Sequence, residues 1–488
     1  MNDPNQTRRG FLKKLGAGLA AAMLPGCTSL PTAPGRAKAA SQGRPNFVII
    51  FTDDQGYQDI GCFGSENIKT PQLDRMAREG MRFTNFYAQT VCGPSRASLM
   101  TGCYPLRVAK RNNQVDIHPY LHTKEITIAE ILSKVGYSTG CFGKWDLAGH
   151  TQTAFDRDLL PTKQGFDYFF GTPSSNDYRV NLMRNDEVIE KSADMNTLTR
   201  RYTDEAIGFI KKNQNKPFFV YIPYTMPHTK LGVSAQWKGR SAGGMYGDVI
   251  EEIDYNAGRI LHTIKSLGLD EQTYVIFTSD NGPWWIKKEH GGSAIPLRGA
   301  KTSTWEGGVR VPCIMRAPGR IPASGVCEEI ARTMDVLPTL AKLAGGQVPA
   351  DRIIDGRDIR ALMHGDKGAT SPSGTFFYYQ NTHLQAVRSG RWKLHLPRPA
   401  NPPWTPNWAR HIDPKDVFDI EKPMLFDLET DIGERQDVAG KHTRVVARLL
   451  KLAEQARQDI GDYDRVGVGA RFFDAQPKRP DAAKWIAQ

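Results

Sequence analysis

Short, continuous apolar runs recur along this chain, and they restrict its fold more than any other feature. Residues 46–52 (N-F-V-I-I-F-T) are rich in β-branched and aromatic side chains, and similar runs occur at 218–222, 274–278 and 311–315. Such runs are typical of strands buried on both faces of a sheet. Helical patterns lie between them, one opened by Thr70-Pro71 and another repeating over 250–264. This alternation predicts an α/β fold: a large mixed, mostly parallel sheet with helices on both faces.

The pattern changes after about residue 371. The strand-like runs become short (375–380, 386–389, 392–396 and 425–428), proline-rich connections separate them, and a helical pattern follows at 445–457. These features predict a smaller antiparallel sheet with a helix packed on it. We therefore divide the body of the chain into a main α/β domain at 45–370 and a smaller C-terminal α+β subdomain at 371–488.

The first 44 residues have the pattern of an export signal followed by a flexible tether. The run R-R-G-F-L at 8–12 resembles a twin-arginine signal, and L-P-G-C at 24–27 resembles a bacterial lipobox. We expect a signal segment at 1–26 that engages the twin-arginine export machinery, and a flexible tether at 27–44. This predicts an exported bacterial protein of the periplasm or cell envelope, with a lipid anchor on Cys27 as its membrane contact. A short amphipathic helix that contains two arginines is the alternative.

The charge balance leaves several classes of partner open. The 488 residues include 64 Lys and Arg against 52 Asp and Glu, a formal net charge of +12. This excess permits nucleic acid, a membrane surface or an anionic substrate. The basic residues come singly or in pairs, such as Lys211-Lys212, so we expect no nucleic-acid partner. Seven scattered cysteines without a C-x-x-C pair argue against a disulfide scaffold and a zinc site.

Two acidic sets follow two of the predicted strands. Asp53-Asp54 come directly after 46–52, and Asp280-Asn281 follow 274–278 in the same way. In α/β sheets, chemistry gathers beyond the carboxyl ends of the strands. Adjacent buried carboxylates need a cation or hydrogen-bond donors, and carboxylate and amide oxygens suit Ca²⁺ or Mg²⁺. The sequence therefore predicts a hard-cation site here, with solvated turns as the alternative.

The most specific motif is the run C-G-P-S-R-A-S-L-M-T-G at 92–102. It places Cys92 before a proline-fixed helix start and Arg96 one turn later. A helix N-terminus and a guanidinium both favour a bound anion, while a buried structural cysteine beside a helix cap is the alternative. The run is similar to the C-x-P-S-R signature of the sulfatase family, including its downstream L-x-T-G. In that family the cysteine is oxidised to formylglycine, whose hydrated aldehyde is the nucleophile.

Further motifs follow in the order that the family uses, and the resemblance spans about residues 45–440. It implies an alkaline-phosphatase-like fold whose catalytic part is the main α/β domain. It also implies a set of metal ligands, which are Asp53, Asp54, Asp280, Asn281 and the modified Cys92. The residues that it implies around the sulfate are Lys144, His228 and Lys301.

A mechanism is implied by the same resemblance. The cofactor is Ca²⁺, with Mg²⁺ as the second choice, and it orients the nucleophile and the sulfate. Arg96 stabilises the nucleophile, Lys144 and Lys301 neutralise the sulfate oxygens, and His228 with Lys301 assists the departing oxygen. Formylglycine implies a further partner, either a formylglycine-generating enzyme or an anaerobic sulfatase-maturating enzyme.

One element departs from the family pattern. The usual G-K-W-H-L-G reads G-K-W-D-L-A-G-H at 143–150, so Asp146 stands where the family has the histidine that regenerates the aldehyde. Asp146 could act as the base, although a reference pKa near 3.9 makes it a weaker one unless burial raises it. Alternatively His150 takes over, or Asp146 only hydrogen-bonds and turnover is slow.

The predicted substrate is a sulfated sugar or oligosaccharide. Candidates for lining the pocket are Trp284, Trp285, Lys287, Lys288 and His290, residues 176–179, and Trp404 and Trp408 from the smaller subdomain. Aromatic faces suit sugar rings and cations suit sulfates, although a loop that packs on the core would have the same composition. Two other functions remain: a phosphate or phosphonate monoester hydrolase of the same fold, and a catalytically impaired lipoprotein that binds sulfated glycans.

Overall fold

The computed structural model describes residues 43–110, 121–402 and 413–473. The predicted signal segment, nearly all of the tether, the Cys27 anchor, and Trp404 and Trp408 lie outside these residues. The described part belongs to one unit, Gly43–Gln488. Its helices include none with the length and apolar character that crossing a membrane requires.

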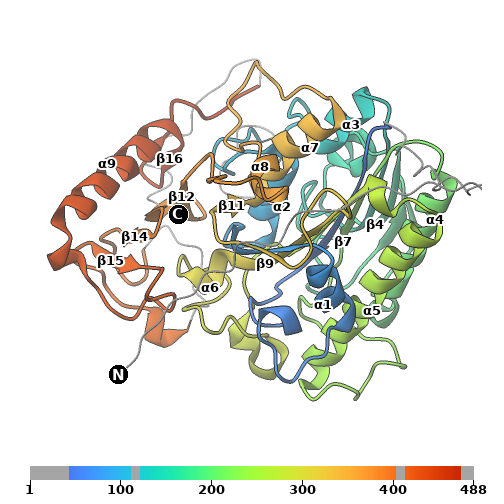
Figure 1. Ribbon diagram of the computed structural model, residues 1–488, viewed down its shortest axis with the longest axis horizontal. Coiled ribbons are helices and arrows are strands. Elements are labelled where there is room, and N and C mark those ends of the chain that lie inside the picture. The colour runs from blue at the N-terminus through green and yellow to red at the C-terminus, as the bar shows by residue number, and fades with distance from the viewer. Residues whose placement is uncertain (1–42, 111–120, 403–412, 474–488) are drawn as a thin grey trace, which may run out of the picture. The chain divides into compact units, whose positions relative to one another are not determined.

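The main sheet has eleven strands and confirms the predicted mixed, mostly parallel architecture (Figure 1). The neighbours β8, β1, β7, β3 and β4 run parallel, whereas β9 pairs antiparallel with β8 and β2, and β5 and β6 form an antiparallel edge. The strands are β1 (Asn46–Thr52), β2 (Met81–Tyr87), β3 (Ser138–Lys144), β4 (Tyr168–Thr172), β5 (Leu182–Arg184), β6 (Glu187–Glu190), β7 (Phe218–Pro223), β8 (Thr273–Ser279), β9 (Arg310–Arg316), β10 (Gly325–Cys327) and β11 (Ala331–Arg332).

Helices cover both faces of this sheet, because alternate side chains of each central strand point to opposite faces. Phe47, Ile49 and Phe51 of β1 pack in a core with α2, α3, α7 and α8, while Val48 and Ile50 pack with α1, α4 and α5. The helices are α1 (Pro71–Arg78), α2 (Cys92–Thr101), α3 (Ile128–Lys134), α4 (Leu198–Lys212), α5 (Gly244–Ser266), α6 (Glu306–Val309), α7 (Val336–Ala344) and α8 (Arg360–Met363).

A separate four-stranded antiparallel sheet follows, in the order β12-β13-β14-β15, with α9 packed on it, as predicted. Figure 1 draws this region in orange and red. Its core continues into the main sheet, since Tyr87 of β2 and Tyr104 pack against Phe376. The elements are β12 (Thr375–Gln380), β13 (His383–Ser389), β14 (Trp392–His395), β15 (Met424–Asp427), α9 (Thr443–Asp459), β16 (Gly461–Asp462) and β17 (Arg465–Val466).

Helix α1 begins at the predicted Thr70-Pro71 start, and its first turn is capped from elsewhere in the chain. The helix begins at Pro71, yet the side chain of Thr70 makes no cap hydrogen bond. Instead the carboxylate of Asp254, from α5, accepts hydrogen bonds from the backbone N–H groups of Gln72 and Leu73. A carboxylate from elsewhere in the chain thus satisfies the exposed donors of the first turn.

Candidate active site

The predicted site residues come together at one edge of the main sheet. Because β8, β1, β7 and β3 are parallel neighbours, their carboxyl ends meet there. Each strand delivers part of the cluster: Asp53 and Asp54 after β1, Asp280 and Asn281 after β8, Lys144 at the end of β3 and His228 in the loop after β7.

The acidic part of this cluster is buried and its oxygens suit a hard cation. Asp53, Asp54, Asp280 and Asn281 are each no more than 2% exposed. Among the described residues, Asp53 Oδ1, Asp54 Oδ2 and Asn281 Oδ1 find no hydrogen-bond partner. Ligand atoms of Asp53, Cys92 and Asp280 lie within 4.8 Å of one another, as do those of Asp53, Asp54 and His228. Buried acceptors rarely stay unsatisfied, so this donor set fits Ca²⁺ or Mg²⁺.

Arg96 braces the acidic cluster from within the core. Its guanidinium is fully buried, and Nη2 lies 3.0 Å from Asp53 Oδ2 and 2.9 Å from Asp280 Oδ2. Nη1 donates to the carbonyl of Lys144 at 2.8 Å. One side chain on α2 therefore ties together the ends of β1, β8 and β3.

Two lysines contact the carboxylates, Lys144 from the end of β3 and Lys301 from the loop before α6. Lys144 Nζ lies 2.7 Å from Asp53 Oδ2, and Lys301 Nζ lies 2.6 Å from Asp54 Oδ1. Burial raises the pKa of Asp53, but Lys144, His228 and Arg96 outweigh it, so the carboxyl titrates below its ordinary value. Asp53 is therefore ionised and available as a ligand at neutral pH, whereas burial and the charge of Asp53 raise the pKa of Asp280 to about 8.

Cys92 is the first residue of α2, so it meets the N-terminal end of a buried helix. Burial, with Asp146 and Asp53 nearby, raises the pKa of its thiol well above the ordinary value, although Lys144 and Lys301 act in the opposite direction. The unmodified residue is therefore a neutral thiol at physiological pH. A thiolate is the nucleophilic form of cysteine, so the unmodified side chain is poorly suited to attack.

Glycines let these segments approach one another closely. Gly143 has φ 142°, and a Cβ there would lie 1.9 Å from the carbonyl oxygen of Pro223. A Cβ on Gly282 would lie 1.8 Å from the oxygen of Gly307. Any side chain would force apart the backbones that carry Lys144 and Asn281.

Asp146 and His150 form a pair beside Lys144. Asp146 is buried and lies with Oδ2 3.8 Å from Lys144 Nζ, and its Oδ1 lies 3.3 Å from His150 Nδ1. Burial lowers the pKa of His150, but the hydrogen bonds and charges of Asp146 and Asp177 outweigh it and raise the pKa to about 9. The loop after β3 thus bends back and places a protonated histidine on the aspartate that replaces the family's histidine.

His228 lies beside Asp54 and packs against Trp284. Its Nε2 is 3.7 Å from Asp54 Oδ2, and the His228 and Trp284 ring centroids are 5.4 Å apart. Burial, and then the charge of Lys301, lower its pKa below the ordinary value. Lys301 Nζ also lies 4.5 Å from the Trp284 ring centroid, so this tryptophan packs against two of the predicted sulfate-facing residues.

Of the other predicted pocket residues, some adjoin the site and others are exposed to solvent. Trp285, Lys287, Lys288 and His290 lie on a short 3₁₀ segment, Trp285–His290, whose last residues are exposed. Lys287 Nζ lies 4.2 Å from the Trp284 ring centroid, so one cation of this segment adjoins the site. From residues 176–179 the structure brings Asp177 to His150 and His228, whereas Tyr178 is 87% exposed.

Ser95 lies within the 92–102 motif, but the sequence alone assigned it no function. Its hydroxyl accepts a hydrogen bond from the backbone N–H of Gln89 at 2.9 Å and donates to the backbone carbonyl of Asp280. It therefore fixes α2 to the end of β8. Its place inside the 92–102 run was the available signal.

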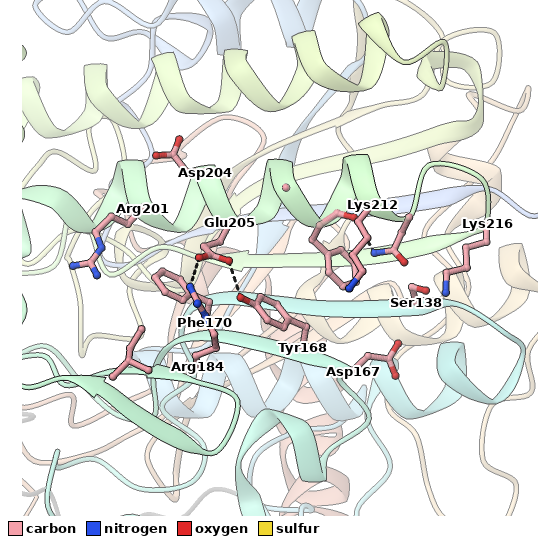
Figure 2. A pocket seen from close by; sticks show the side chains of 14 residues that line it. Ser138, Asp167, Tyr168, Phe170, Arg184, Arg201, Asp204, Glu205, Lys212 and Lys216 are labelled. Carbon is pink, nitrogen blue, oxygen red and sulfur yellow. Dashed lines mark hydrogen bonds and ion pairs between the residues drawn. The ribbon is translucent and has the colours of Figure 1, made fainter.

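A hollow of about 990 Å³ lies elsewhere, at the amino ends of β3 and β4, beside α4 (Figure 2). Figure 2 shows Glu205 bonded to both Arg184 and Tyr168. Arg201 is paired with Glu190. These charges compensate one another, and the hollow lies at the opposite ends of the strands from the acidic cluster.

Comparison with known proteins identifies the arrangement. The family model described as Sulfatase matches residues 45–346, and the model described as the C-terminal region of aryl-sulfatase matches 371–470. The chain belongs to the sulfatase family. It is therefore a sulfuric ester hydrolase of the alkaline-phosphatase-like superfamily.

Individual relatives agree with this assignment. Human steryl-sulfatase is 31% identical, and the match covers 92% of this chain and 91% of that protein. A Pseudoalteromonas sulfatase structure superposes with a TM-score of 0.75 at 27% identity, covering 84% and 89% of the two chains. A Bacteroides thetaiotaomicron structure, reported under the metabolism of multiple glycosaminoglycans, gives 0.74 at 27% identity, covering 85% and 99%.

Proposed function

We propose that this sulfatase hydrolyses a sulfate ester on a sulfated carbohydrate, using a formylglycine made from Cys92 and a bound Ca²⁺. The observation that carries the proposal is the placement of Cys92, at the N-terminus of α2, within 4.8 Å of the buried ligand atoms of Asp53 and Asp280. When bound, the cation would supply Lewis-acid polarisation of the sulfate group. The hydrated aldehyde of formylglycine would supply the nucleophile that a neutral thiol does not.

The surrounding residues take roles that follow from their positions. The cation is held by Asp53, Asp54, Asp280 and Asn281. Arg96 keeps the carboxylates of Asp53 and Asp280 in place. Lys144 and Lys301 present ammonium groups from two sides and neutralise sulfate oxygens. His228 with Lys301 assists the departing oxygen, and Asp146, paired with the protonated His150, accepts the proton whose removal precedes sulfate release.

A sugar is the substrate class that the site surroundings favour. Trp284 presents an aromatic ring beside His228, and Lys287 lies over that ring, which suits a sugar face with a neighbouring sulfate. Relatives differ here, since one carries the name steryl-sulfatase and another was reported under glycosaminoglycan metabolism. A panel of defined sulfated mono- and oligosaccharides, with a steroid sulfate as comparison, tests the choice.

The mass of residue 92 tests the mechanism. Protein coexpressed with a formylglycine-generating or anaerobic sulfatase-maturating enzyme should give a peptide whose Cys92 has become formylglycine, and should release sulfate. Cys92→Ala should release none. Unmodified Cys92 in a fully active preparation would refute the formylglycine mechanism.

Two rate comparisons separate this proposal from other reactions. We expect kcat/KM on an aryl sulfate to exceed kcat/KM on the matching aryl phosphate and phosphonate. A clear preference for phosphate would favour a phosphomonoester hydrolase, and binding of sulfated glycans without sulfate release would favour a lipoprotein that only binds.

We further propose export by the twin-arginine machinery and lipidation of Cys27 in the cell envelope. The support is the order of the R-R-G-F-L and L-P-G-C runs within residues 1–27. Labelled fatty acid should be incorporated into the full chain and not into Cys27→Ala. Replacing Arg8 and Arg9 by lysine should leave the protein in the cytoplasm.

A further inference from the structure

Asp177 stands between the two histidines of the site. Its Oδ2 lies 3.2 Å from His150 Nε2, and its Oδ1 lies 3.6 Å from His228 Nε2. The three residues come from different loops, after β4, β3 and β7 respectively. One carboxylate thus offers a separate oxygen to each imidazole.

Each histidine also touches a second acid, which extends the contact in both directions. His150 Nδ1 lies 3.3 Å from Asp146 Oδ1, and His228 Nε2 lies 3.7 Å from Asp54 Oδ2. His150 therefore has a carboxylate at both ring nitrogens. The acids and histidines thus form one connected chain of contacts from Asp146 to Asp54.

We propose that Asp177 is a positioning residue that orients His150 and His228 together, and so aligns Asp146, which His150 holds, with the histidine that assists the departing oxygen. This inference rests on the proposed function, and it assigns a role to Asp177, to which the proposed mechanism gives none. The orientation of an imidazole is set by the partner of its other nitrogen, and such partners contribute to activity without touching substrate. For His150 that partner is Asp177, because Asp146 occupies Nδ1.

The position of Asp177 also explains how the departure at Asp146 is accommodated. Asp146 brings a carboxylate where the family has an imidazole, and His150 returns an imidazole four residues later. A histidine at that point is on a loop and is 41% exposed, so its ring needs a second anchor to stay on Asp146. Asp177 supplies this anchor from the loop after β4.

Three variants test the proposal in the full, matured protein. Asp177→Asn keeps the size but removes the charge, Asp177→Glu keeps the charge, and Asp158→Asn makes the same change at an exposed carboxylate of the 145–180 region. We expect Asp177→Asn to lower kcat by about 10–100-fold, with KM changed less than kcat and Tm close to that of wild type. Asp177→Glu should recover part of kcat, and Asp158→Asn should match wild type.

Leaving-group dependence gives the sharper readout. His228 assists the departing oxygen. A misplaced His228 should therefore slow the hydrolysis of aryl sulfates with poor leaving groups more than that of aryl sulfates with good ones. His150→Gln should lower kcat without steepening that dependence. In the double variant of Asp177 and His150, the two losses should be less than additive, since both disturb one unit.

The outcomes separate this inference from the proposed function. Sulfate release by wild type, with Asp177→Asn equal to wild type in kcat and leaving-group dependence, overturns the positioning role and leaves the function intact. A fall in Tm that parallels the fall in kcat, without recovery in Asp177→Glu, also overturns it, because a structural role then suffices. Absence of sulfate release by matured wild type removes the function itself.

Discussion

Asp146 combines an unusual backbone with an unusual side chain for its place in the family. Its φ is 55°, in the left-handed region, where aspartate is tolerated better than most residues. Asp54 has φ 65° in the same way. Two acidic residues at strand ends therefore hold strained conformations, which is common where surrounding contacts fix a functional side chain.

The charge on His150 provides a prediction for Asp146→Asn. Its pKa, raised to about 9, means that the folded protein holds this proton at pH 7 and loses it as pH rises through about 9. Removing the carboxylate of Asp146 should shift the pKa downward, toward the ordinary value near 6.5. Histidine NMR titration measures the shift, with His150→Gln assigning the signal.

Activity should fall in the same variant. Loss of a general base costs typically 10²–10⁴-fold, so we expect kcat to drop by about 10²-fold. If Asp146→Asn keeps full kcat and the His150 pKa is unmoved, the pair has no part in turnover.

The proposed metal ligands carry a second prediction at this scale. Asp280 is buried, with one oxygen bonded to the backbone N–H of Asp54 and the other to Arg96. Ca²⁺ that binds the folded state alone should stabilise it by about 2.7 kcal/mol at a concentration of 100 Kd. Thermal unfolding of chelator-treated protein should therefore shift upward on adding Ca²⁺, and Asp280→Asn should reduce the shift. Equal shifts in wild type and variant would place the cation elsewhere.

At the scale of elements, the small sheet holds the segment that carries Lys301. Thr302, the next residue, has φ 71°, which is costly for a β-branched side chain. Its backbone N–H donates to Thr90, its carbonyl accepts from Gln380 of β12, and Lys393 of β14 donates to the carbonyl of Thr304. The smaller sheet thereby fixes the position of the lysine proposed to face the sulfate.

Lys393 gives a stability prediction for this contact. It is fully buried and lies 3.0 Å from Glu306 and 2.8 Å from Glu434. Lys393→Met would leave two buried carboxylates without their common cation, a change that typically costs about 3–5 kcal/mol. Denaturant unfolding measures the loss, and Lys415→Met, at a lysine whose side chain is 74% exposed, is the control.

The pH dependence of that loss has a definite sign. Burial raises the pKa of Glu434 to about 7 even with Lys393 beside it, whereas Lys393, Arg388 and Arg310 outweigh burial at Glu306 and lower its pKa. Without Lys393 both pKa values would rise, so the folded variant would bind more protons than the folded wild type. Its stability should then fall as pH rises above about 4.5, and the deficit against wild type should be larger at pH 8 than at pH 5. A deficit that is the same at both values would mean that the carboxyls are not what Lys393 stabilises.

Apolar runs in the sequence predicted β1, β7, β8 and β9 of the main sheet, the strands of the small sheet, and the acids that follow β1 and β8, because these are local properties. It could not predict that Asp254 caps α1, or that Asp177 reaches two histidines, since these contacts join segments far apart in the chain. Arg96 illustrates the same limit. Its motif indicated an anion nearby, but only the fold shows that the guanidinium contacts Asp53 and Asp280, two carboxylates of the proposed metal site.

At the scale of the whole molecule, the positive charge is not concentrated in the site. Arg96, Lys144 and Lys301 are each paired with a carboxylate there. The formal +12 therefore resides largely outside the acidic cluster. Beside Trp284, Lys287 is half-buried and Lys288 is exposed, so under the proposed function these two cations would face the further sulfates of a multiply sulfated substrate.

This distribution predicts that salt weakens binding of a long substrate more than of a small one. The Debye length falls from about 30 Å at 0.01 M to about 3 Å at 1 M, so attraction by exposed cations is lost over that range. We expect KM for a multiply sulfated oligosaccharide to rise by about an order of magnitude, while KM for an aryl sulfate changes little. Steady-state kinetics across this salt series measures both.

A matched pair of variants locates the effect. Replacing Lys287 and Lys288 by glutamine should flatten the salt dependence for the oligosaccharide, because these cations adjoin the site. The same replacement at Lys211 and Lys212 removes equal charge from the end of α4, where Lys212 lines the hollow at the amino ends of β3 and β4. That variant should keep the wild-type slope. Equal flattening by both would mean that the charge acts as a diffuse field and that the segment after Trp284 does not guide the sulfated chain.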